Sequence, residues 1–314
     1  MKSRIHPTYK TKYRVTNWRE YERGLVQRGD VTVWLSQEAI DAWEAAPTGR
    51  RGAQPKFSGL AIETALTLRL VFNLPLRQTE GFLCSLFRMM GVDLEAPDHT
   101  TLSRRSADLD VPLARRARNE PIDLIIDSSG LAVVGEGEWA AAKHGGNGRR
   151  GWKKLHLGVD VSGEVHAQVL TASNVDDGTT GVAIINEVPG EIDSVIAGAA
   201  YDSRPIYKAA ESKGAKVVVP PSRTASTSKG KRPSMARDRT IRRVEKVGRR
   251  QWKKDSGYHR QGRVENTFFR YKMVLGDRLR SRSLAAQETE ACLACNLLNR
   301  MRTLGWPRSE KIAW

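Results

Sequence analysis

The series of short apolar segments that follows Pro121 limits the possible folds more than any other feature of this sequence. I-D-L-I-I-D (122–127) is an apolar run of strand length that is followed by the turn-forming S-S-G. K-K-L-H-L-G-V-D (153–160) and E-V-H-A-Q-V-L (164–170) alternate between apolar and polar residues, and V-S-G joins them. This pattern predicts a buried strand followed by a β-hairpin.

Helices and strands alternate over the segments that come next. Residues 175–188 contain a helix and residues 205–213 form another, by the spacing of their apolar residues. S-V-I-A-G-A-A-Y-D (194–202) and A-K-V-V-V-P (215–220) have the apolar character of buried strands. Three strands in a meander, then helix, strand, helix and strand, predict an α/β fold with a mixed five-stranded sheet flanked by helices.

The sequence before Pro121 has helical character. Helices are expected over 58–73 and 76–90, with Gly91 as a stop, and Asp98 can cap a third over H-T-T-L-S-R-R. Helix, turn and short helix in this order resemble a helix-turn-helix, whose second helix lies in the DNA major groove. Simple packing of three helices explains the same pattern, and both interpretations stay open.

A chain of 314 residues is long enough for two domains, and changes in composition divide it further. Ser36 can cap a short helix to about Glu44, and T-G-R-R-G-A-Q-P-K (48–56) is typical of a linker. We expect a basic N-terminal region, a helical DNA-binding domain, a catalytic domain and a C-terminal tail, at residues 1–57, 58–118, 119–305 and 306–314.

The net charge of +17 is concentrated in two segments. Residues 221–263 carry fifteen Lys and Arg against three acids, and residues 1–30 carry eight against three. Such a surplus indicates a polyanionic partner, and binding to it should depend steeply on salt. A membrane is disfavoured because no run of about 18 apolar residues exists. A solvated, mobile basic loop would explain part of 221–237 equally well.

The cysteines and the N-terminus indicate a reducing compartment. Cys292 and Cys295 fall in an apolar helical pattern without the further Cys or His residues that a zinc site needs, so core positions are expected. With Cys84 they make three cysteines in all, and disulfides are not expected. The first ten residues lack the apolar core of a secretory signal. We expect a cytoplasmic protein.

Two of the predicted buried strands end in a carboxylate, at Asp127 and at Asp202. In open α/β sheets the site lies just beyond the carboxyl ends of the strands, so both acids could meet there. Two adjacent carboxylates repel each other unless a cation lies between them. Oxygen ligands without nearby His or Cys favour Mg²⁺ or Mn²⁺, and two such ions serve in-line phosphoryl displacement. Taken singly, each acid fits a turn or helix-capping role as well.

A third acid strengthens the metal-site interpretation. G-Y-H-R-Q-G-R-V-E-N-T-F-F-R-Y-K-M-V-L (257–275) predicts a helix, on which Tyr258, Glu265 and Lys272 are spaced by seven and share one face. Glu265 can complete the carboxylate set, and Lys272 can hold a DNA phosphate. A surface salt bridge is the alternative role for Glu265.

Three motifs resemble those of a known family. I-D-S-S-G-L around Asp127, A-Y-D-S-R around Asp202 and R-V-E-N-T-F-F-R-Y-K around Glu265 match, in order, the acidic motifs of the DDE transposases of bacterial insertion sequences. The IS-five group and the related IS-four group are the most similar. The resemblance extends over about residues 55–305, and its motifs are specific jointly rather than singly.

The C-terminal signature of that family departs at one position. Tyr258 and Lys272 match its tyrosine and lysine on either side of the glutamate, but Gln261 stands where the family has arginine. Arg260 and Arg263 flank that position, which leaves open the arginine that would hold a phosphate. The three acids are unaffected.

The resemblance implies a ribonuclease H-like catalytic fold with a basic insertion, at about 221–256, before the glutamate helix. It implies cleavage of DNA at terminal inverted repeats and joining of the freed 3′-OH to target DNA, with Asp127, Asp202 and Glu265 as catalytic and metal-binding residues. It also implies a multimer on DNA that pairs two element ends.

Further residues are expected near DNA. Contacts are predicted for residues of the signature segment and of the short third helix: Tyr258, Arg260, Arg263, Lys272, Thr100, Ser103, Arg104 and Arg105. Lys153, Lys154 and His156 fit either the site or strand decoration, and His144 stands in a Gly-rich loop that lacks the ending of a phosphate-binding motif. A ribonuclease H-like nuclease and a domesticated DNA-binding protein are the alternative functions.

Overall fold

The computed structural model describes residues 13–29, 36–47, 49, 51–118, 120–133, 152–228 and 235–311. The chain forms two compact units. One combines residues 1–35 with residues 299–314, and the other contains residues 36–298. The Gly-rich loop with His144, the predicted linker's residues 48 and 50, and residues 229–234 of the basic segment lie outside the described residues.

The smaller unit joins the two ends of the chain. Its strands β1 (Tyr13–Val15) and β8 (Ser309–Lys311) pair antiparallel, and helix α1 (Trp18–Gln27) follows β1. A Cβ on Gly24 of α1 would lie 2.5 Å from the carbonyl oxygen of Leu304, so only glycine permits this close approach. The C-terminal residues therefore take part in a small sheet with the N-terminal region.

The larger unit is built on the mixed sheet that the sequence predicts. Its order is β4-β3-β2-β5-β6, and a sixth short strand, β7, pairs with β2 beyond the five expected. Strand β3 pairs antiparallel with both β2 and β4, while β5 and β7 pair parallel with β2, and β6 pairs parallel with β5. The bounds are Ile122–Val133 for β2, Trp152–Val159 for β3, Val165–Ala172 for β4, Ile192–Ala197 for β5, Lys216–Val218 for β6 and Arg278–Leu279 for β7.

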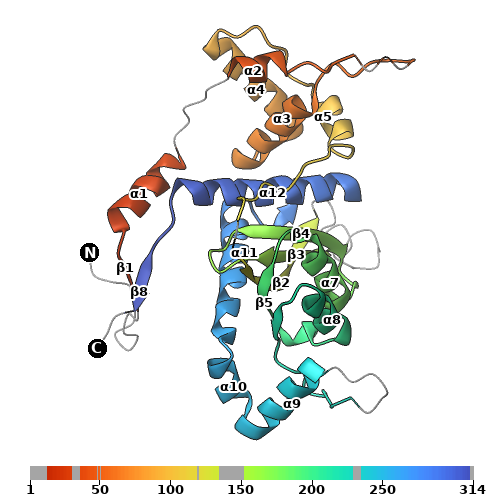
Figure 1. Cartoon of the computed structure of the whole chain (residues 1–314). Helices are drawn as coiled ribbons and strands as arrows, with labels where there is room; N and C mark the ends of the chain where they lie inside the picture. The colour runs from red at the N-terminus through yellow and green to blue at the C-terminus, as the bar shows by residue number, and fades with distance from the viewer. Residues whose placement is uncertain are drawn as a thin grey trace, which may run out of the picture. The chain divides into compact units, whose positions relative to one another are not determined.

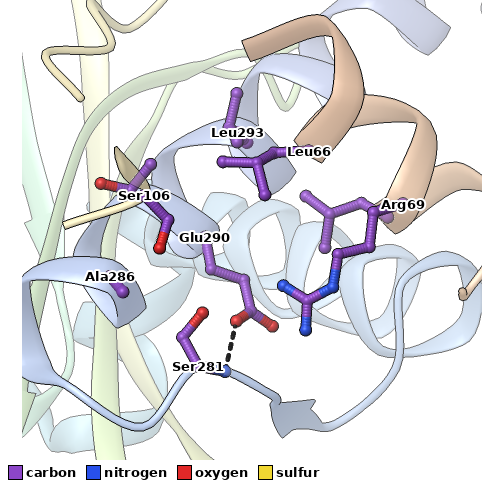
Figure 2. A pocket seen from close by; sticks show the side chains of 9 residues that line it. Leu66, Arg69, Ser106, Ser281, Ala286, Glu290 and Leu293 are labelled. Atoms are coloured by element: carbon purple, nitrogen blue, oxygen red, sulfur yellow. Dashed lines mark hydrogen bonds between the residues drawn. The ribbon is translucent and has the colours of Figure 1, made fainter. Parts of the chain in front are cut away.

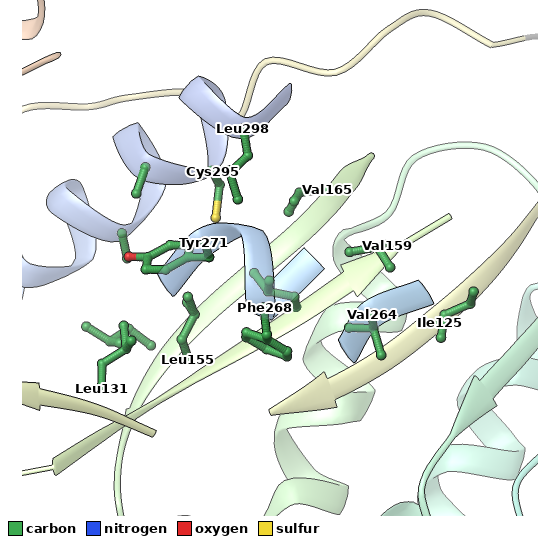
Figure 3. Packing of buried hydrophobic residues seen from close by; sticks show 14 of the residues in the cluster. Ile125, Leu131, Leu155, Val159, Val165, Val264, Phe268, Tyr271, Cys295 and Leu298 are labelled. Atoms are coloured by element: carbon green, nitrogen blue, oxygen red, sulfur yellow. The ribbon is translucent and has the colours of Figure 1, made fainter. Parts of the chain in front are cut away.

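Helices cover both faces of this sheet (Figure 1). Helices α7 (Asp177–Glu187) and α8 (Arg204–Ser212) pack on one face, through residues such as Ile184 and Ile206. Helices α11 (Gly262–Val274) and α12 (Leu284–Leu304) cover the other. Figure 3 shows Val264, Phe268 and Tyr271 of α11 between the strands and Cys295 of α12. Burial of these apolar faces fixes α11 against the sheet.

Two expectations about the strands are wrong. Strand β2 does not end at Asp127 but continues to Val133, because its polar half keeps pairing with β3. Strand β5 ends at Ala197, and a 3₁₀ turn, η1 (Ala199–Tyr201), separates it from Asp202. Tyr201 leaves the sheet and packs on α7, where a Cβ at Gly181 would meet its ring at 2.8 Å. Ala and Tyr residues are compatible both with a longer strand and with a turn, so the sequence pattern alone does not distinguish these two conformations.

The N-terminal helices of the larger unit follow their predicted capping residues. Ser36 and Ser58 cap α2 (Gln37–Asp41) and α3 (Gly59–Val71) through their hydroxyl oxygens. Helix α4 (Leu76–Met90) ends at Gly91, which has the positive φ of 66° that favours glycine. Asp98 caps α5 (His99–Arg105) by accepting hydrogen bonds from two backbone amides. The helices are confirmed, and a DNA-reading role for them stays a prediction.

A small pocket lies where α3 meets α12. Figure 2 shows Arg69 and Leu66 of α3 facing Glu290 and Leu293 of α12. Burial lowers the pKa of Arg69, and the charge of Glu290 opposes that effect. The Glu290 carboxylate also accepts a hydrogen bond of 2.8 Å from the amide of Ser281. This buried charge pair fastens the helical segment to α12.

The predicted basic insertion contains two helices, α9 (Met235–Val247) and α10 (Arg249–Asp255). Ile241 and Trp252 are their buried residues on the apolar side. Several of their basic side chains are exposed to solvent: Arg239, Arg242, Arg243, Lys246 and Arg250. The described insertion is thus mostly helical and presents a basic surface.

In the described part of the chain, no single helix is both long and apolar enough to cross a membrane, although α3 and α4, bent by 108°, meet those limits as a pair.

Candidate active site

Asp127 lies where β5 stops beside β2. The last pair between these parallel strands is Ile126 with Ala197, so Asp127 is the first residue of β2 beyond it. Its carboxylate accepts a hydrogen bond of 2.9 Å from the amide of Ser128. The carboxyl end of β5 therefore opens the sheet at Asp127, which is the position expected for a site in such a fold.

Burial and two neighbouring acids act on Asp127. Burial raises the pKa of its carboxyl group, the Ser128 amide lowers it, and the charges of Glu265 and Asp177 raise it further. The net pKa lies above the usual value. No Lys or Arg is among the described groups that shift it. The groups that shift the pKa of Asp127 therefore include two acids and no cation, an environment in which a bound cation would favour the ionised carboxylate.

Glu265 lies in the first turn of α11, and its charge raises the pKa of Asp127. It is exposed, while Val264 before it is buried in the core that fixes the helix. Tyr258 joins them from the 3₁₀ turn η2 (Tyr258–Gln261), which precedes α11. Burial, and then the charges of Asp127 and Glu265, raise the pKa of Tyr258. These three predicted residues thus influence one another electrostatically, and their common role in a site stays a prediction.

The expected continuous helix over 257–275 is wrong in its first turn. Residues 258–261 form the 3₁₀ turn, because Gly257 before it adopts a positive φ of 72°. Gln261 of this turn is buried, and its side-chain amide donates to the carbonyl oxygen of Ile126 at 3.2 Å. The departure from the family's arginine therefore places an amide against the backbone of β2.

Asp202 has a different environment. Arg237 of α9 forms a two-bond ion pair with its carboxylate, with both N···O distances at 2.8 Å, and the amide of Ser222 donates to it at 2.9 Å. The Asp202 side chain is fully buried. The described contacts of Asp202 thus neutralise it within the fold, and its catalytic role stays a prediction.

Gly198, rather than Asp202, continues β5 opposite Asp127. It follows Ala197 directly, so the parallel register would pair it with Asp127. A Cβ added to Gly198 would meet nothing within 4 Å. The position beside Asp127 therefore has room for a side chain and carries none.

Asp177 is the residue near Asp127 that the sequence reasoning missed. It is the first residue of α7 and accepts an ion pair of 2.7 Å from Lys154. The Nδ1 atom of His156 lies 4.0 Å from the same carboxylate. An acid at the start of a helix is explained by the helix dipole, so V-D-D-G gave no signal beyond capping. Lys154 and His156, predicted either to belong to the site or to decorate the strand surface, lie beside Asp177.

The basic residues of the signature segment, predicted to contact DNA, differ in their exposure and in the contacts that they already make. Arg260 pairs with Asp123 of β2 and donates to the carbonyl oxygen of Gly257 at 3.3 Å. Arg263 is exposed, and Lys272 is half-buried. Of the two candidate arginines, Arg263 is thus the one exposed for a phosphate.

The predicted DNA-reading residues of α5 are only partly exposed. Thr100, Ser103 and Arg104 are exposed, whereas Arg105 donates to the carbonyl oxygen of Phe57 at 2.9 Å. The Thr100 hydroxyl also bonds to the Asp98 cap. Ser103 and Arg104 are therefore the best placed of the four for an external partner.

A second acidic cluster lies at the turn between β3 and β4. Asp160, Glu164 and His166 are buried, and their ligand atoms lie within 4.8 Å of one another. Arg118 lies 2.6 Å from the Asp160 carboxylate and 3.6 Å from that of Glu164. The amide of Arg116 donates to Glu164 at 2.8 Å. A guanidinium group therefore occupies the place that a cation would take.

The sheet order and the helices on both faces define the class of the larger unit, a mixed α/β domain. The comparison with protein families identifies it further. Residues 118–300, more than half of the chain, match the family described as transposase DDE domain, and residues 26–136 match a second model of that description. The chain belongs to the DDE transposase family. It is a DNA transposase, an enzyme of DNA cleavage and strand transfer.

Proposed function

We propose that Asp127 and Glu265 are the central metal-binding carboxylates of this transposase. The observation that supports this proposal most strongly is the position of Asp127 just beyond the last β2–β5 pair, where the charge of Glu265 raises its pKa. Burial and mutual repulsion raise the pKa of Asp127. A divalent cation would remove that repulsion and favour the ionised carboxylate.

The donor set fits a hard cation. Carboxylate oxygens are the ligands that Mg²⁺ prefers and Mn²⁺ accepts, and the exposure of Glu265 leaves room for water ligands. A pair of such ions, when bound, activates the attacking oxygen and stabilises the leaving oxygen of a phosphoryl displacement. Asp127 and Glu265 would hold this charge in place, and Tyr258 would border the substrate.

Both chemical steps are displacements at phosphorus. In the first, the oxygen of water attacks a phosphodiester at the element end, the bond to the 3′ oxygen breaks, and a 3′-OH is freed. In the second, this 3′-OH attacks a phosphodiester of target DNA, and the target's own 3′ oxygen leaves. The protein's contribution is to position the two DNA strands and to neutralise charge. Arg263 and Lys272 are proposed to hold phosphates close to the cut.

Asp202 would take part after a rearrangement. Its ion pair with Arg237 would have to open before it could face a metal ion. Arg237 belongs to the basic insertion, and a DNA phosphate offers its guanidinium group another partner of the same geometry. We therefore propose that DNA binding competes with Asp202 for Arg237.

The DNA substrates are proposed to be the terminal inverted repeats and the target. The exposed basic residues of α9 and α10 supply phosphate contacts, and Ser103 and Arg104 of α5 supply contacts in a groove. Pairing of two element ends would require at least two copies of the chain on DNA. Binding should weaken steeply with salt, since each phosphate contact releases counterions.

The test is Mg²⁺-dependent cleavage of DNA that carries the matching repeat ends. Asp127→Asn and Glu265→Gln are expected to abolish cleavage, while a matched control, the exposed Asp193→Asn, keeps it. Strand transfer with pre-cut ends should fail in the same two variants. Full cleavage by Asp127→Asn or Glu265→Gln would remove that residue from the proposed site. Full cleavage by Asp202→Asn would assign Asp202 a structural role with Arg237.

A further inference from the structure

The side chain of Gln261 is buried, and only part of its hydrogen-bonding capacity is used. Its Nε2 atom donates to the carbonyl oxygen of Ile126 at 3.2 Å. Its Oε1 atom is also buried and has no hydrogen-bond partner among the described residues. A buried acceptor without a partner costs stability. Stability alone therefore does not account for an amide at this position.

The group that Gln261 holds belongs to the backbone of the site. The carbonyl oxygen that accepts its hydrogen bond is part of the peptide unit that joins Ile126 to Asp127. Ile126 is also the last residue of β2 that pairs with β5, whereas Asp127 pairs only with Leu157 of β3. The Gln261 amide thus fixes β2 at the point where the support of β5 ends.

Arg260, the residue before Gln261, is attached to the same strand. Its guanidinium group forms an ion pair with Asp123, and only 29% and 20% of the two side-chain surfaces are accessible. The guanidinium group also donates to the carbonyl oxygen of Gly257 at 3.3 Å, and Asp123 accepts a further hydrogen bond from the hydroxyl group of Ser194 in β5. Arg260 therefore joins the turn η2 to β2 and, through Asp123, to β5.

The attachments of this segment follow one row of side chains on β2. Asp123, Ile125 and Asp127 alternate along the strand, so they share one face of the sheet. Ile125 belongs to the same buried cluster as Val264 of α11 (Figure 3). Glu265 comes directly after Val264. The segment that carries Glu265 is therefore held along the face of β2 on which Asp127 lies.

We propose that Arg260 and Gln261 are positioning residues, which align the segment that carries Glu265 with the strand that carries Asp127. This inference rests on the proposed function, since it concerns the geometry of the same site. Gln261 has no charge and is turned toward β2, and Arg260 already has a carboxylate partner. The phosphate contact that the signature arginine would make is thus left to the exposed Arg263.

The first test measures kcat and the KM for DNA ends separately in the full-length protein, with Mg²⁺ present and thermal unfolding as a check of the fold. Gln261→Met should lower kcat about tenfold or more, because misplaced groups slow the chemical step, and should leave KM unchanged. The matched control is Gln287→Met. Gln287 is also buried, donates to the carbonyl oxygen of Ser281 at 2.9 Å and has an Oε1 atom without a partner among the described residues. This control should keep kcat.

A double-mutant cycle tests Arg260. Arg260→Gln and Asp123→Asn should each lower kcat, and the double variant should be no slower than the slower single variant, because all three lose the same ion pair. Arg260→Lys, which keeps a cation for Asp123, should restore most of kcat. The salt dependence of DNA binding should be unchanged in Arg260→Gln, whereas Arg263→Gln should reduce its slope by about one, as the loss of one phosphate contact requires.

The outcomes separate this inference from the proposed function. A raised KM with unchanged kcat in Gln261→Met, or a reduced salt slope in Arg260→Gln, would reveal a direct DNA contact and overturn the inference. Wild-type kcat in both variants, with cleavage lost in Asp127→Asn, would overturn the inference and leave the proposed function intact. Full cleavage by Asp127→Asn would overturn the proposed function itself. Gln261→Asn keeps the amide on a shorter side chain, and it should show the same loss of kcat if Gln261→Met fails to fold.

Discussion

Two groups of acids in the larger unit differ in how their negative charge is balanced. At the β3–β4 turn, Arg118 contacts both Asp160 and Glu164. Beyond the end of β5, the charges of Glu265 and Asp177 act on Asp127. Burial by itself raises the pKa of Asp160 too, but hydrogen bonds from His166, Ser162 and the Glu164 amide, with the charge of Arg118, leave it below its usual value. The pKa of Asp127 stays above it.

The difference shows that proximity of acids does not by itself define a metal site. The Asp160 cluster has the tighter geometry, with ligand atoms within 4.8 Å of one another. It is nevertheless complete, because the protein supplies its own cation. Around Asp127, by contrast, neighbouring acids raise the pKa, and an external cation would relieve that repulsion.

The largest expected effect is a loss of catalytic activity that distinguishes the Asp127 group from the Asp160 cluster. Asp127→Asn should lower cleavage and strand transfer by about a thousandfold or more, because the displacement loses metal-borne charge stabilisation. Asp160→Asn should leave the catalytic rate of the folded protein unchanged. Both are measured with Mg²⁺ and saturating DNA ends. A comparable loss of rate in the two variants would end the distinction between them.

The next effect concerns stability. Arg118→Gln removes the cation from two buried carboxylates and should lower the free energy of unfolding by about 3 kcal/mol. Arg115→Gln is the matched control, since its partner Glu187 is 39% exposed and such pairs contribute less than about 1 kcal/mol. Urea unfolding at neutral pH measures both. Equal losses would show that Arg118 is an ordinary surface charge.

A smaller gain is expected from an added carboxylate. Gly198→Asp places one beside Asp127 without a clash and should tighten Mn²⁺ binding by about tenfold. Gly198→Asn, which has the same shape without the charge, is the control. If neither variant changes Mn²⁺ affinity, position 198 does not face the site, and the register argument at the end of β5 is wrong.

Local signals predicted the first helices of the larger unit closely, although α9 and α10 of the basic insertion were not predicted. Ser58, Gly91 and Asp98 have specific roles at helix ends, so the bounds of α3, α4 and α5 could be read from neighbouring residues. The five main strands of the mixed sheet could be predicted from the succession of apolar segments, whereas their order in the sheet was not predicted. The short strands β1, β7 and β8 were missed because two or three residues carry no period.

The site was less accessible to the sequence. Asp127 and Glu265 were found because each belongs to a motif and to a buried element. The exact end of β5 depends on Tyr201 packing against Gly181, a long-range contact that no local pattern reports. Asp177 was not singled out because the helix dipole ordinarily explains an acid at the start of a helix. The residues missed are thus those whose role depends on tertiary contacts.

The smallest effect is the pH dependence of stability, which has opposite signs in the two clusters. Burial and neighbouring acids raise the pKa of Asp127, so its ionised form costs stability above that pKa, and acid relieves the cost. Asp127→Asn should therefore be more stable than the wild type at neutral pH, and this gain should shrink as the pH falls toward the ordinary range of aspartate. The lowered pKa of Asp160 has the reverse consequence. Its ionised form stabilises the folded protein above the ordinary pKa range of aspartate, and this stabilisation is lost on acidification. Asp160→Asn should be less stable at neutral pH, with a deficit that shrinks in acid. Unfolding curves of both variants across the acidic range measure this, and shifts of the same sign would mean that the two carboxylates are balanced alike.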